Sequence, residues 1–326
     1  MFSSGFVAPA HYDLVPRGMN FALTATETLG KCLPELDIEQ IHKAEGQLQA
    51  SLCGYYKIKT KSGALFFAKV KAFDKAQREE VASELSTRLF HQGARTIPLH
   101  SSSPAFGSEG MQIFVYPWVD GVFFDESDVQ TETLGRELAA LHNALHKLPG
   151  NGAERKNILD TWKEQLELTA YTSFAPEYAA RLRVAEKVFS RSEGCLAHND
   201  LHRANVLFAR DGGVAAFIDF EDSAGVNSSI LVDLSAVIER FCMLPDSSRK
   251  RVSLLLTNYL NQLDLEIELR ASDIVQIGIC RCFHSLSILN ASPAYDNPGW
   301  MSEVAKFEIL IKRWKSWEPL LLSTIP

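Results

Sequence analysis

The sequence predicts an α+β protein of two lobes, a small strand-rich N-terminal lobe and a larger, mainly helical C-terminal lobe. Between residues 51 and 118, aromatic and β-branched residues form short runs that turn residues separate, which is typical of strands. From Leu134 onward, apolar residues recur at intervals of three and four, which is typical of core-facing helices. A chain of 326 residues, 46% of them hydrophobic, is long enough to build two cores. We place the lobes at residues 19–118 and 119–326.

The first eighteen residues have a different character from the rest. Leu14 to Gly18 spell LVPRG directly before Met19, which is typical of an engineered protease site. We therefore expect residues 1–18 to be an engineered leader and exclude them from the fold prediction. A native disordered leader is the alternative.

Overall composition excludes several classes of protein. The net charge of −7 gives no global attraction for nucleic acid. The sequence contains no run of eighteen apolar residues, so we expect no membrane span. Its six cysteines form no CxxC pair and have no zinc-ligand spacing, and no secretory signal is evident, so we expect a cytoplasmic protein with free thiols. The sequence does not indicate an oligomeric state.

Elements of the N-terminal lobe follow from changes in periodicity. Residues 24–49 have apolar residues at helical spacing, so we expect one or two short helices there. Two strand-like runs flank a turn at Lys61–Gly63 and predict a β-hairpin. A helix over residues 74–92 should end at Gly93. Lys69 lies among apolar residues in the second strand, where its ammonium group must reach solvent or an anion.

Elements of the C-terminal lobe are predicted to be mostly helices. LGRELAALHNALHKL, which ends at Leu148, has a regular apolar stripe, and we expect His142 beside it to be a packing residue. Further helical patterns occupy residues 160–190 and the chain from Ser229 onward, with a last helix over residues 301–317 that ends before Pro319. A cleft between two such lobes is a natural ligand site.

The most specific chemical signal is HNDLHRANVLF, residues 198–208, followed by AFIDFED, residues 216–222. Asp200 lies in a polar loop, where its carboxylate can face a substrate. Asn205 and Asp219 offer an amide oxygen and a carboxylate, and such hard oxygen ligands suit Mg²⁺. A metal site beside a carboxylate that can accept a hydroxyl proton is the equipment of phosphoryl transfer.

These residues carry a family resemblance. HNDLHRANVLF followed by IDFED resembles the motif of the aminoglycoside phosphotransferase and choline kinase superfamily, which has the protein-kinase-like fold. The resemblance extends in the right order over nearly all of residues 30–320. LGRELAALH is similar to the family's helix before the catalytic loop, and VDLSAV is similar to its structural Asp-Leu-Ala segment. The resemblance implies a bilobal protein-kinase-like fold.

The resemblance also implies roles for the motif residues. Asp200 would be the catalytic base or the acid that orients the hydroxyl group. Asn205 and Asp219 would bind Mg²⁺. His198 would support the loop, and Asp233 would be the structural acid of the family's later segment.

In the N-terminal lobe, Lys69 corresponds to the family's strand lysine, which holds the α- and β-phosphates of ATP. Its helix partner should be Glu84, because Glu84 lies fourteen residues before Pro98, as is common in the family. Glu80, one turn earlier, is the second choice.

The same resemblance places the nucleotide. Residues Tyr116 to Trp118 would form the hinge that meets adenine through backbone groups. The nucleotide loop departs from the family pattern, because EGQLQASLCGYY contains only Gly46 and Gly54. Ser51 and Gly54 are our candidates for phosphate contacts, together with small neighbours such as Ala50.

We therefore expect an ATP- and Mg²⁺-dependent kinase, a phosphotransferase with an alcohol group as acceptor, that acts on a small, amine-bearing molecule. HND and IDFE favour the choline and ethanolamine kinase branch. Glu221, Asp222 and Trp300 are candidate substrate contacts, and either acid could also assist the metal. A quaternary ammonium would need aromatic faces, and the C-terminal part offers Tyr295, Trp300, Trp314 and Trp317.

Several alternatives stay open at this stage. An aminoglycoside would need carboxylates, and an acidic run follows the hinge at Asp120, Asp125, Glu126 and Asp128. A sugar or homoserine kinase fits the same motifs. The glycine-poor loop leaves room for a kinase-fold regulatory or nucleotide-binding protein with little activity. A protein kinase is disfavoured, because only fourteen positions separate Asp219 from Asp233 and leave little room to cradle a peptide.

Overall fold

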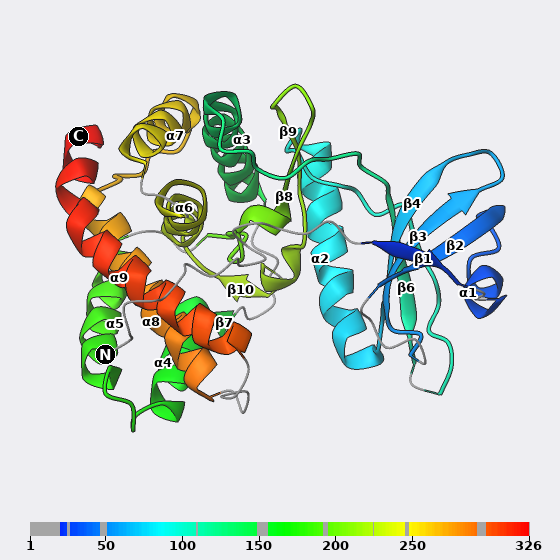
Figure 1. The fold of residues 1–326 in the computed structure, drawn as a ribbon, viewed down its shortest axis with the longest axis horizontal. Helices are drawn as coiled ribbons and strands as arrows, with labels where there is room; N and C mark the ends of the chain where they lie inside the picture. The colour runs from blue at the N-terminus through cyan, green and yellow to red at the C-terminus, as the bar shows by residue number, and fades with distance from the viewer. Residues whose placement is uncertain are drawn as a thin grey trace.

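The computed structural model describes most of the chain in two lobes, a sheet-containing lobe and a helical lobe, with one long helix between them (Figure 1). The described residues are 20–24, 27–45, 51–108, 110–148, 156–191, 195–223, 225–244, 248–291 and 298–325. The predicted leader and the loop residues Gly46 and Ala50 lie outside these ranges, and so does Tyr295.

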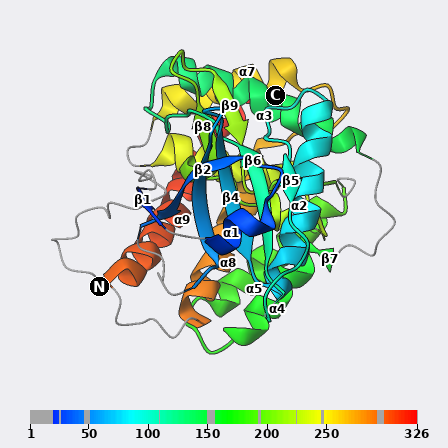
Figure 2. The same ribbon diagram turned by 90° about the vertical axis from the view of Figure 1, so that its right-hand side faces the viewer.

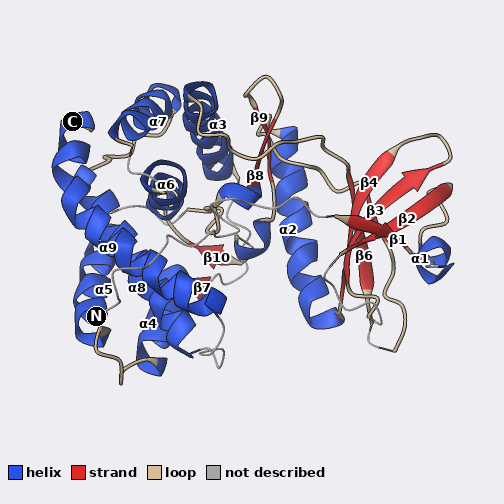
Figure 3. Cartoon of the chain, in the orientation of Figure 1, coloured by secondary structure: helices blue, strands red, loops and turns tan. Residues whose placement is uncertain are grey.

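The N-terminal lobe, whose strands are red in Figure 3, is built on a six-stranded antiparallel sheet. The strand order is β1-β2-β3-β4-β6-β5. Its strands are β1 (Phe21–Leu23), β2 (Ile38–Ala44), β3 (Gly54–Thr60), β4 (Leu65–Lys71), β5 (Ser101–Ser102) and β6 (Gln112–Pro117). The predicted hairpin is confirmed, since β3 and β4 pair in register around Gly63, whose φ of 86° is one that glycine adopts without strain. The helix α1 (Glu27–Cys32) covers one face of the sheet, where Leu29 and Leu33 pack against Tyr56 and Ile58.

One expectation for this lobe was wrong. The spacing of Ile38 and Ile41 predicted a helix, yet both residues lie in strand β2. Short apolar runs fit either period, and here pairing with β3 decides in favour of a strand. The helix α2 (Phe73–His91) lies within one residue of its predicted bounds, and its exposed apolar residues include Val81 and Phe90, at 48% and 47%.

The C-terminal lobe is helical around a long apolar core. Its main helices are α3 (Asp128–Lys147), α4 (Ile158–Leu168), α5 (Ala175–Phe189), α6 (Ile230–Val237), α7 (Arg249–Gln262), α8 (Ala271–Ala291) and α9 (Pro298–Thr324). Two small sheets join β8 (Val206–Phe208) to β9 (Val214–Phe217) and β7 (Lys156–Asn157) to β10 (Val226–Asn227). Helix α3 packs on α7, and α8 packs on α9. The last helix passes through Pro319, where we expected the chain to leave the helix.

Helix α8 is long and apolar enough to cross a membrane by length and composition. It packs against α4, α5, α6 and α9, and its buried residues include Ile277, Cys280 and Phe283. Helices in the core of soluble proteins have the same composition, so this helix is explained by its place in the core.

Between the lobes, α2 contacts the sheet at β4 and β6 and the short 3₁₀ helix η2 (Phe220–Asp222) of the C-terminal lobe. Viewed from the side of the sheet, the strands lie in front of the helical lobe (Figure 2). Helix α2 therefore connects the sheet to the segment that carries the IDFED motif.

Candidate active site

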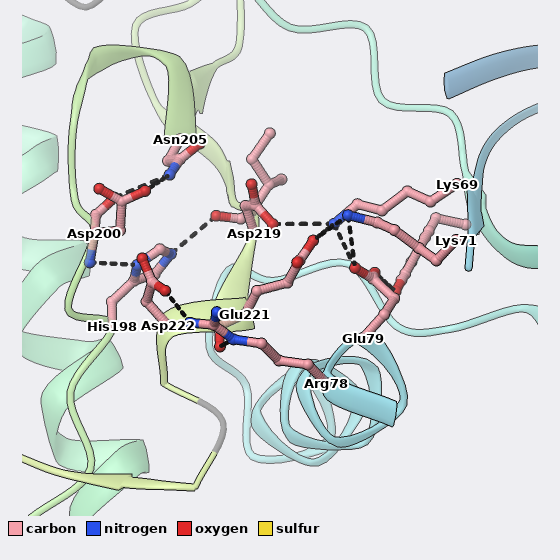
Figure 4. A network of polar contacts seen from close by, with 12 residues as sticks. Lys69, Lys71, Arg78, Glu79, His198, Asp200, Asn205, Asp219, Glu221 and Asp222 are labelled. Atoms are coloured by element: carbon pink, nitrogen blue, oxygen red, sulfur yellow. Dashed lines mark hydrogen bonds and ion pairs between the residues drawn. The ribbon is translucent and has the colours of Figure 1, made fainter. Parts of the chain in front are cut away.

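Asp200 and Asn205 lie together in the loop that precedes β8 (Figure 4). The side-chain amide of Asn205 donates hydrogen bonds to the backbone oxygen of Asp200 at 2.9 Å and to its Oδ2 at 3.2 Å. A turn of 3₁₀ helix, Arg203–Asn205, brings the two residues together, and the His202 ring accepts from the backbone N–H of Ala204 to cap it. The five-residue spacing therefore places both side chains at one site.

Asp219 joins this site through the pairing of β8 with β9. Val206 is opposite Phe217, and the backbone N–H of Ile218 donates to the backbone oxygen of Asn205 at 3.0 Å. Asp219 itself has φ of 68° and ψ of 66°. Left-handed backbone is costly for a non-glycine residue and is concentrated at functional sites.

Lys69 reaches across from β4 to this segment. Its Nζ lies 3.0 Å from Oε2 of Glu79, 3.0 Å from Oδ1 of Asp219 and 3.2 Å from Oε1 of Glu221. Burial alone would lower the pKa of Lys69, but the surrounding carboxylates outweigh it and raise this pKa well above its ordinary value. Lys69, which was expected to reach either solvent or an anion, is therefore a charged group held by carboxylates of both lobes.

The predicted helix partner of Lys69 was wrong. Its partner is Glu79, whereas Glu84 and the second choice Glu80 are exposed. Glu84 lies five residues after Glu79, about 140° further around the helix, and Glu80 lies about 100° away, so neither faces β4. Glu79 is 1% exposed and also accepts a hydrogen bond of 2.6 Å from the Tyr116 hydroxyl.

Glu221 and Asp222 both bind cations of the N-terminal lobe. Lys71 lies 2.7 Å from Oε1 of Glu221, and Arg78 pairs with Asp222 and donates to the backbone oxygen of Glu221 at 2.8 Å. Burial would raise the pKa of Glu221, but hydrogen bonding to Glu79 and the two lysines lower it. Burial and the nearby Asp200 raise the pKa of Asp222. Their predicted contact with substrate stays a prediction, and the structure gives each acid a basic partner.

His198 and Asp233 form the support beneath the loop. Asp233 is fully buried and accepts hydrogen bonds from the backbone N–H groups of His198 and Asn199, at 2.6 and 2.7 Å. His142 lies 3.3 Å from Asp233 and 2.8 Å from the Tyr259 hydroxyl. The His198 ring makes a hydrogen bond of 2.9 Å with the backbone oxygen of Ile218. These contacts fix the loop backbone and fit the supporting roles predicted for both residues.

Arg203 is a further residue of the loop that the sequence analysis did not single out. Its guanidinium is 2% exposed and donates to the backbone oxygens of Arg240 and Leu244, at 2.7 and 2.6 Å, and to Glu126 at 3.0 Å. Arg240 belongs to a turn of π-helix, Ile238–Met243, whose carbonyl groups need donors. In the sequence, this anchoring role is signalled only by the position of Arg203 within the motif HNDLHRANVLF.

The predicted hinge lies beside a cavity of about 440 Å³. Trp118 lines it, and the backbone N–H of Trp118 donates to the backbone oxygen of Leu65 at 3.1 Å. The cavity lining is Asn20, Phe21, Gln40, His42, Lys57, Lys59, Leu65 and Trp118. The registers pair Lys57 with Phe67 and Tyr55 with Lys69, so the strand residues of the cavity share one face of the sheet with Lys69.

Of the predicted loop contacts, Ser51 and Gly54 lie within the described residues. The Ser51 hydroxyl accepts from the backbone N–H of Cys53 at 3.2 Å, and Gly54, with φ of 147°, begins β3 opposite Val70. Both therefore lie where the loop rejoins the sheet, close to β4. Whether they contact phosphate stays a prediction.

The donor set fits a magnesium ion. Among the described residues, no hydrogen bond reaches Oδ1 of Asn205 or Oδ2 of Asp219, which leaves one amide and one carboxylate oxygen for a cation. Oxygen ligands of this kind suit Mg²⁺. Glu79, Asp219 and Glu221 also present oxygens within 4.8 Å of one another, but the Lys69 ammonium group already binds all three.

The other predicted substrate contacts are only partly placed. Trp300 lies in the first turn of α9, whereas Trp314 and Trp317 are buried in the core. In the acidic run, Glu126 binds Arg203 and Arg251, Asp128 binds Lys250, and Asp120 accepts from the Trp118 indole. These three carboxylates thus have partners within the protein.

Comparison with known proteins places this site in a family. The family model described as "Phosphotransferase enzyme family" matches residues 60–249. A search of the curated proteins finds no significant match. Among solved structures, a spectinomycin phosphotransferase in complex with ADP and spectinomycin aligns with a TM-score of 0.61 and 16% identity, over 89% of this chain and 94% of that chain.

Two further structures align equally well. An amicoumacin kinase in complex with AMP-PNP and Ca²⁺ has a TM-score of 0.62 and 16% identity, over 87% of this chain and 92% of that chain. A choline kinase from Streptococcus pneumoniae has a TM-score of 0.62 and 14% identity, over 89% of this chain and 98% of that chain. At these identities the likeness establishes the fold, and it confirms the predicted bilobal kinase-like architecture. Since the family model covers more than half of the sequence, the chain belongs to the phosphotransferase enzyme family.

Proposed function

We propose that this protein is an ATP- and Mg²⁺-dependent kinase that transfers the γ-phosphate to a hydroxyl group of a small molecule. The observation that carries the proposal is the ion pair of 3.0 Å between Lys69 and Asp219, 150 positions apart. In this pair, Lys69 is a cation that can bind phosphate, and Asp219 is a carboxylate that can bind a metal ion. Asn205 and Asp200 lie beside that carboxylate.

The cavity beside Trp118 is the proposed position of the nucleotide base. Along β4, Leu65 lines this cavity and Lys69 lies four residues further on the same face, about 13 Å away. That separation suits the span from a base to its phosphates. Asn205 and Asp219 would hold the magnesium ion, which neutralises charge on the transferred phosphate when it is bound.

Asp200 is the proposed acceptor of the hydroxyl proton. Burial would raise the pKa of Asp200, but the neighbouring His202, His198 and Arg240 outweigh it and lower this pKa. The carboxylate is therefore ionised at neutral pH and can orient the hydroxyl. The hydroxyl oxygen attacks the γ-phosphorus, its proton passes to Asp200, and the bond from phosphorus to the ADP oxygen breaks.

The substrate class is proposed from the motifs. HND and IDFE favour an amine-bearing acceptor such as choline or ethanolamine, and the similar structures named above include kinases for spectinomycin, amicoumacin and choline. A small-molecule substrate in the cytoplasm remains our expectation. Sugars and homoserine belong in the same test.

The decisive experiment measures ADP release with MgATP and a panel of amino alcohols, aminoglycosides, sugars and homoserine. Asp200→Ala should lower kcat by about a hundredfold to ten-thousandfold on the best acceptor, with nucleotide binding retained. The matched control is Asp264→Ala, which removes an exposed carboxylate from the segment between α7 and α8. Equal turnover in the Asp200 variant and wild type would exclude the assigned base. Tight MgATP binding without turnover on any acceptor would instead favour a nucleotide-binding regulatory protein.

A further inference from the structure

Lys71 is a second lysine on the cleft face of β4, two residues after Lys69. Residues two apart on a strand project from the same face, and Figure 4 shows both ammonium groups converging on Glu221. Oε1 of Glu221 lies 3.2 Å from Lys69 Nζ and 2.7 Å from Lys71 Nζ. One carboxylate oxygen thus binds two cations at once.

Lys71 lies near the end of the predicted nucleotide loop, EGQLQASLCGYY. Gly54, where the loop ends, pairs with Val70, the residue directly before Lys71. Its ammonium group is 5.7 Å from the centre of the Tyr55 ring. Along β4 the order from the cavity is therefore Leu65, Lys69 and then Lys71, so Lys71 would lie nearest the distal phosphates of a nucleotide whose base occupied that cavity.

Carboxylates hold Lys71 at this point, and Glu221 is the carboxylate that binds both Lys71 and Lys69 most directly. Lys71 is 13% exposed and lies 3.9 Å from Glu79 as well as against Glu221. A triphosphate needs several positive groups or backbone N–H groups around it. The loop that the resemblance predicts to supply such groups contains only Gly46 and Gly54.

We propose that Lys71 binds the β- and γ-phosphates of the nucleotide together with Lys69, and that a phosphate oxygen takes the place that Glu221 occupies between the two ammonium groups. This inference rests on the proposed kinase function. It makes Lys71 a nucleotide-binding residue that compensates for the glycine-poor loop. Glu221 becomes the group that holds both lysines in position before the nucleotide arrives.

The test compares binding of ATP, ADP and AMP to wild type and to Lys71→Met by calorimetry. We expect ATP and ADP to bind about tenfold more weakly, because each loses a charge-assisted contact, while AMP affinity changes less than about twofold. Lys71→Arg should retain part of the ATP affinity. Lys75→Met removes the same charge from an exposed position of α2 and should bind all three nucleotides like wild type.

A purely structural role for Lys71 predicts a different pattern. Loss of the 2.7 Å ion pair with Glu221 would then lower the melting temperature of Lys71→Met, and ATP and ADP affinities would match wild type, which would overturn the inference. The double variant Lys71→Met/Glu221→Gln removes the charge of both members of this ion pair, so it permits the binding measurement if the single variant folds poorly. Wild type that binds neither ATP nor ADP would refute the proposed function as well, whereas wild-type binding with an unaffected Lys71 variant refutes this inference alone.

Discussion

The ammonium group of Lys69 lies 3.0 Å from Oε2 of Glu79, a carboxylate that is 1% exposed and is held by the Tyr116 hydroxyl on its other oxygen. This pair fixes the lysine from the side of α2, and Asp219 fixes it from the other lobe. The position of the proposed phosphate-binding cation therefore depends on both lobes.

Glu79→Gln should raise the KM for ATP by about tenfold to a hundredfold, because it removes a charge-assisted hydrogen bond worth ~1.5–3 kcal/mol. Glu84→Gln, an exposed glutamate on the same helix, should leave the KM for ATP unchanged. Steady-state kinetics at saturating acceptor checks both. A larger effect at Glu84 than at Glu79 would contradict the pairing seen in the structure.

Asp233→Asn should lower the free energy of unfolding by ~1–3 kcal/mol at neutral pH, because the amide nitrogen cannot accept from a buried backbone N–H. Burial would raise the pKa of Asp233, but His142 and His198 outweigh it and lower this pKa. A lowered carboxylate pKa stabilises the fold above the unfolded value near 3.9, and this stability is lost as pH falls through the folded value.

The difference in free energy of unfolding between wild type and Asp233→Asn should therefore become smaller below about pH 4. Urea unfolding of both proteins at several pH values measures this difference. Asp37→Asn, at a surface ion pair with Lys61, is the control and should change stability little. A constant difference across the acid range would argue that Asp233 contributes through packing alone.

Arg203→Met should lower the free energy of unfolding by ~2–3 kcal/mol, since it leaves the buried carbonyls of Arg240 and Leu244 without this donor. It should also lower kcat, because the loop that carries Asp200 and Asn205 loses its anchor. Arg210→Met, an exposed arginine just after β8, is the control. Denaturant unfolding and kinetics at saturating substrates check the two effects. An unchanged denaturant midpoint for Arg203→Met would show that the loop does not need the Arg203 contacts.

Asn205→Ala should raise the Mg²⁺ concentration for half-maximal activity by about tenfold or more, because it removes a proposed ligand oxygen. Excess Mg²⁺ should restore part of the rate, whereas a chelator should abolish activity in both proteins. Asn261→Ala, at an exposed position of α7, should follow the wild-type Mg²⁺ titration. Identical titrations for the Asn205 variant and wild type would exclude Asn205 as a ligand.

Much of the fold followed from local pattern. The hairpin around Gly63, the helix ending before Gly93 and the apolar stripe of α3 each depend on residues near one another in the chain. Strand β2 did not follow, because Ile38 and Ile41 fit a helical spacing and only pairing with β3 makes them a strand.

The sequence by itself determined the family, the two-lobe fold and the motif that brings Asp200, Asn205 and Asp219 together, because those residues are close in the chain and their chemistry is specific. Tertiary structure alone decided which glutamate meets Lys69, that Lys71 shares an oxygen of Glu221, and that Arg203 anchors the loop. The physical reason is that the rotation of α2 about its axis, and the packing of β4 and the π-helix against the motif, are set by contacts between segments far apart in the sequence. A count of residues from Pro98 cannot report such contacts.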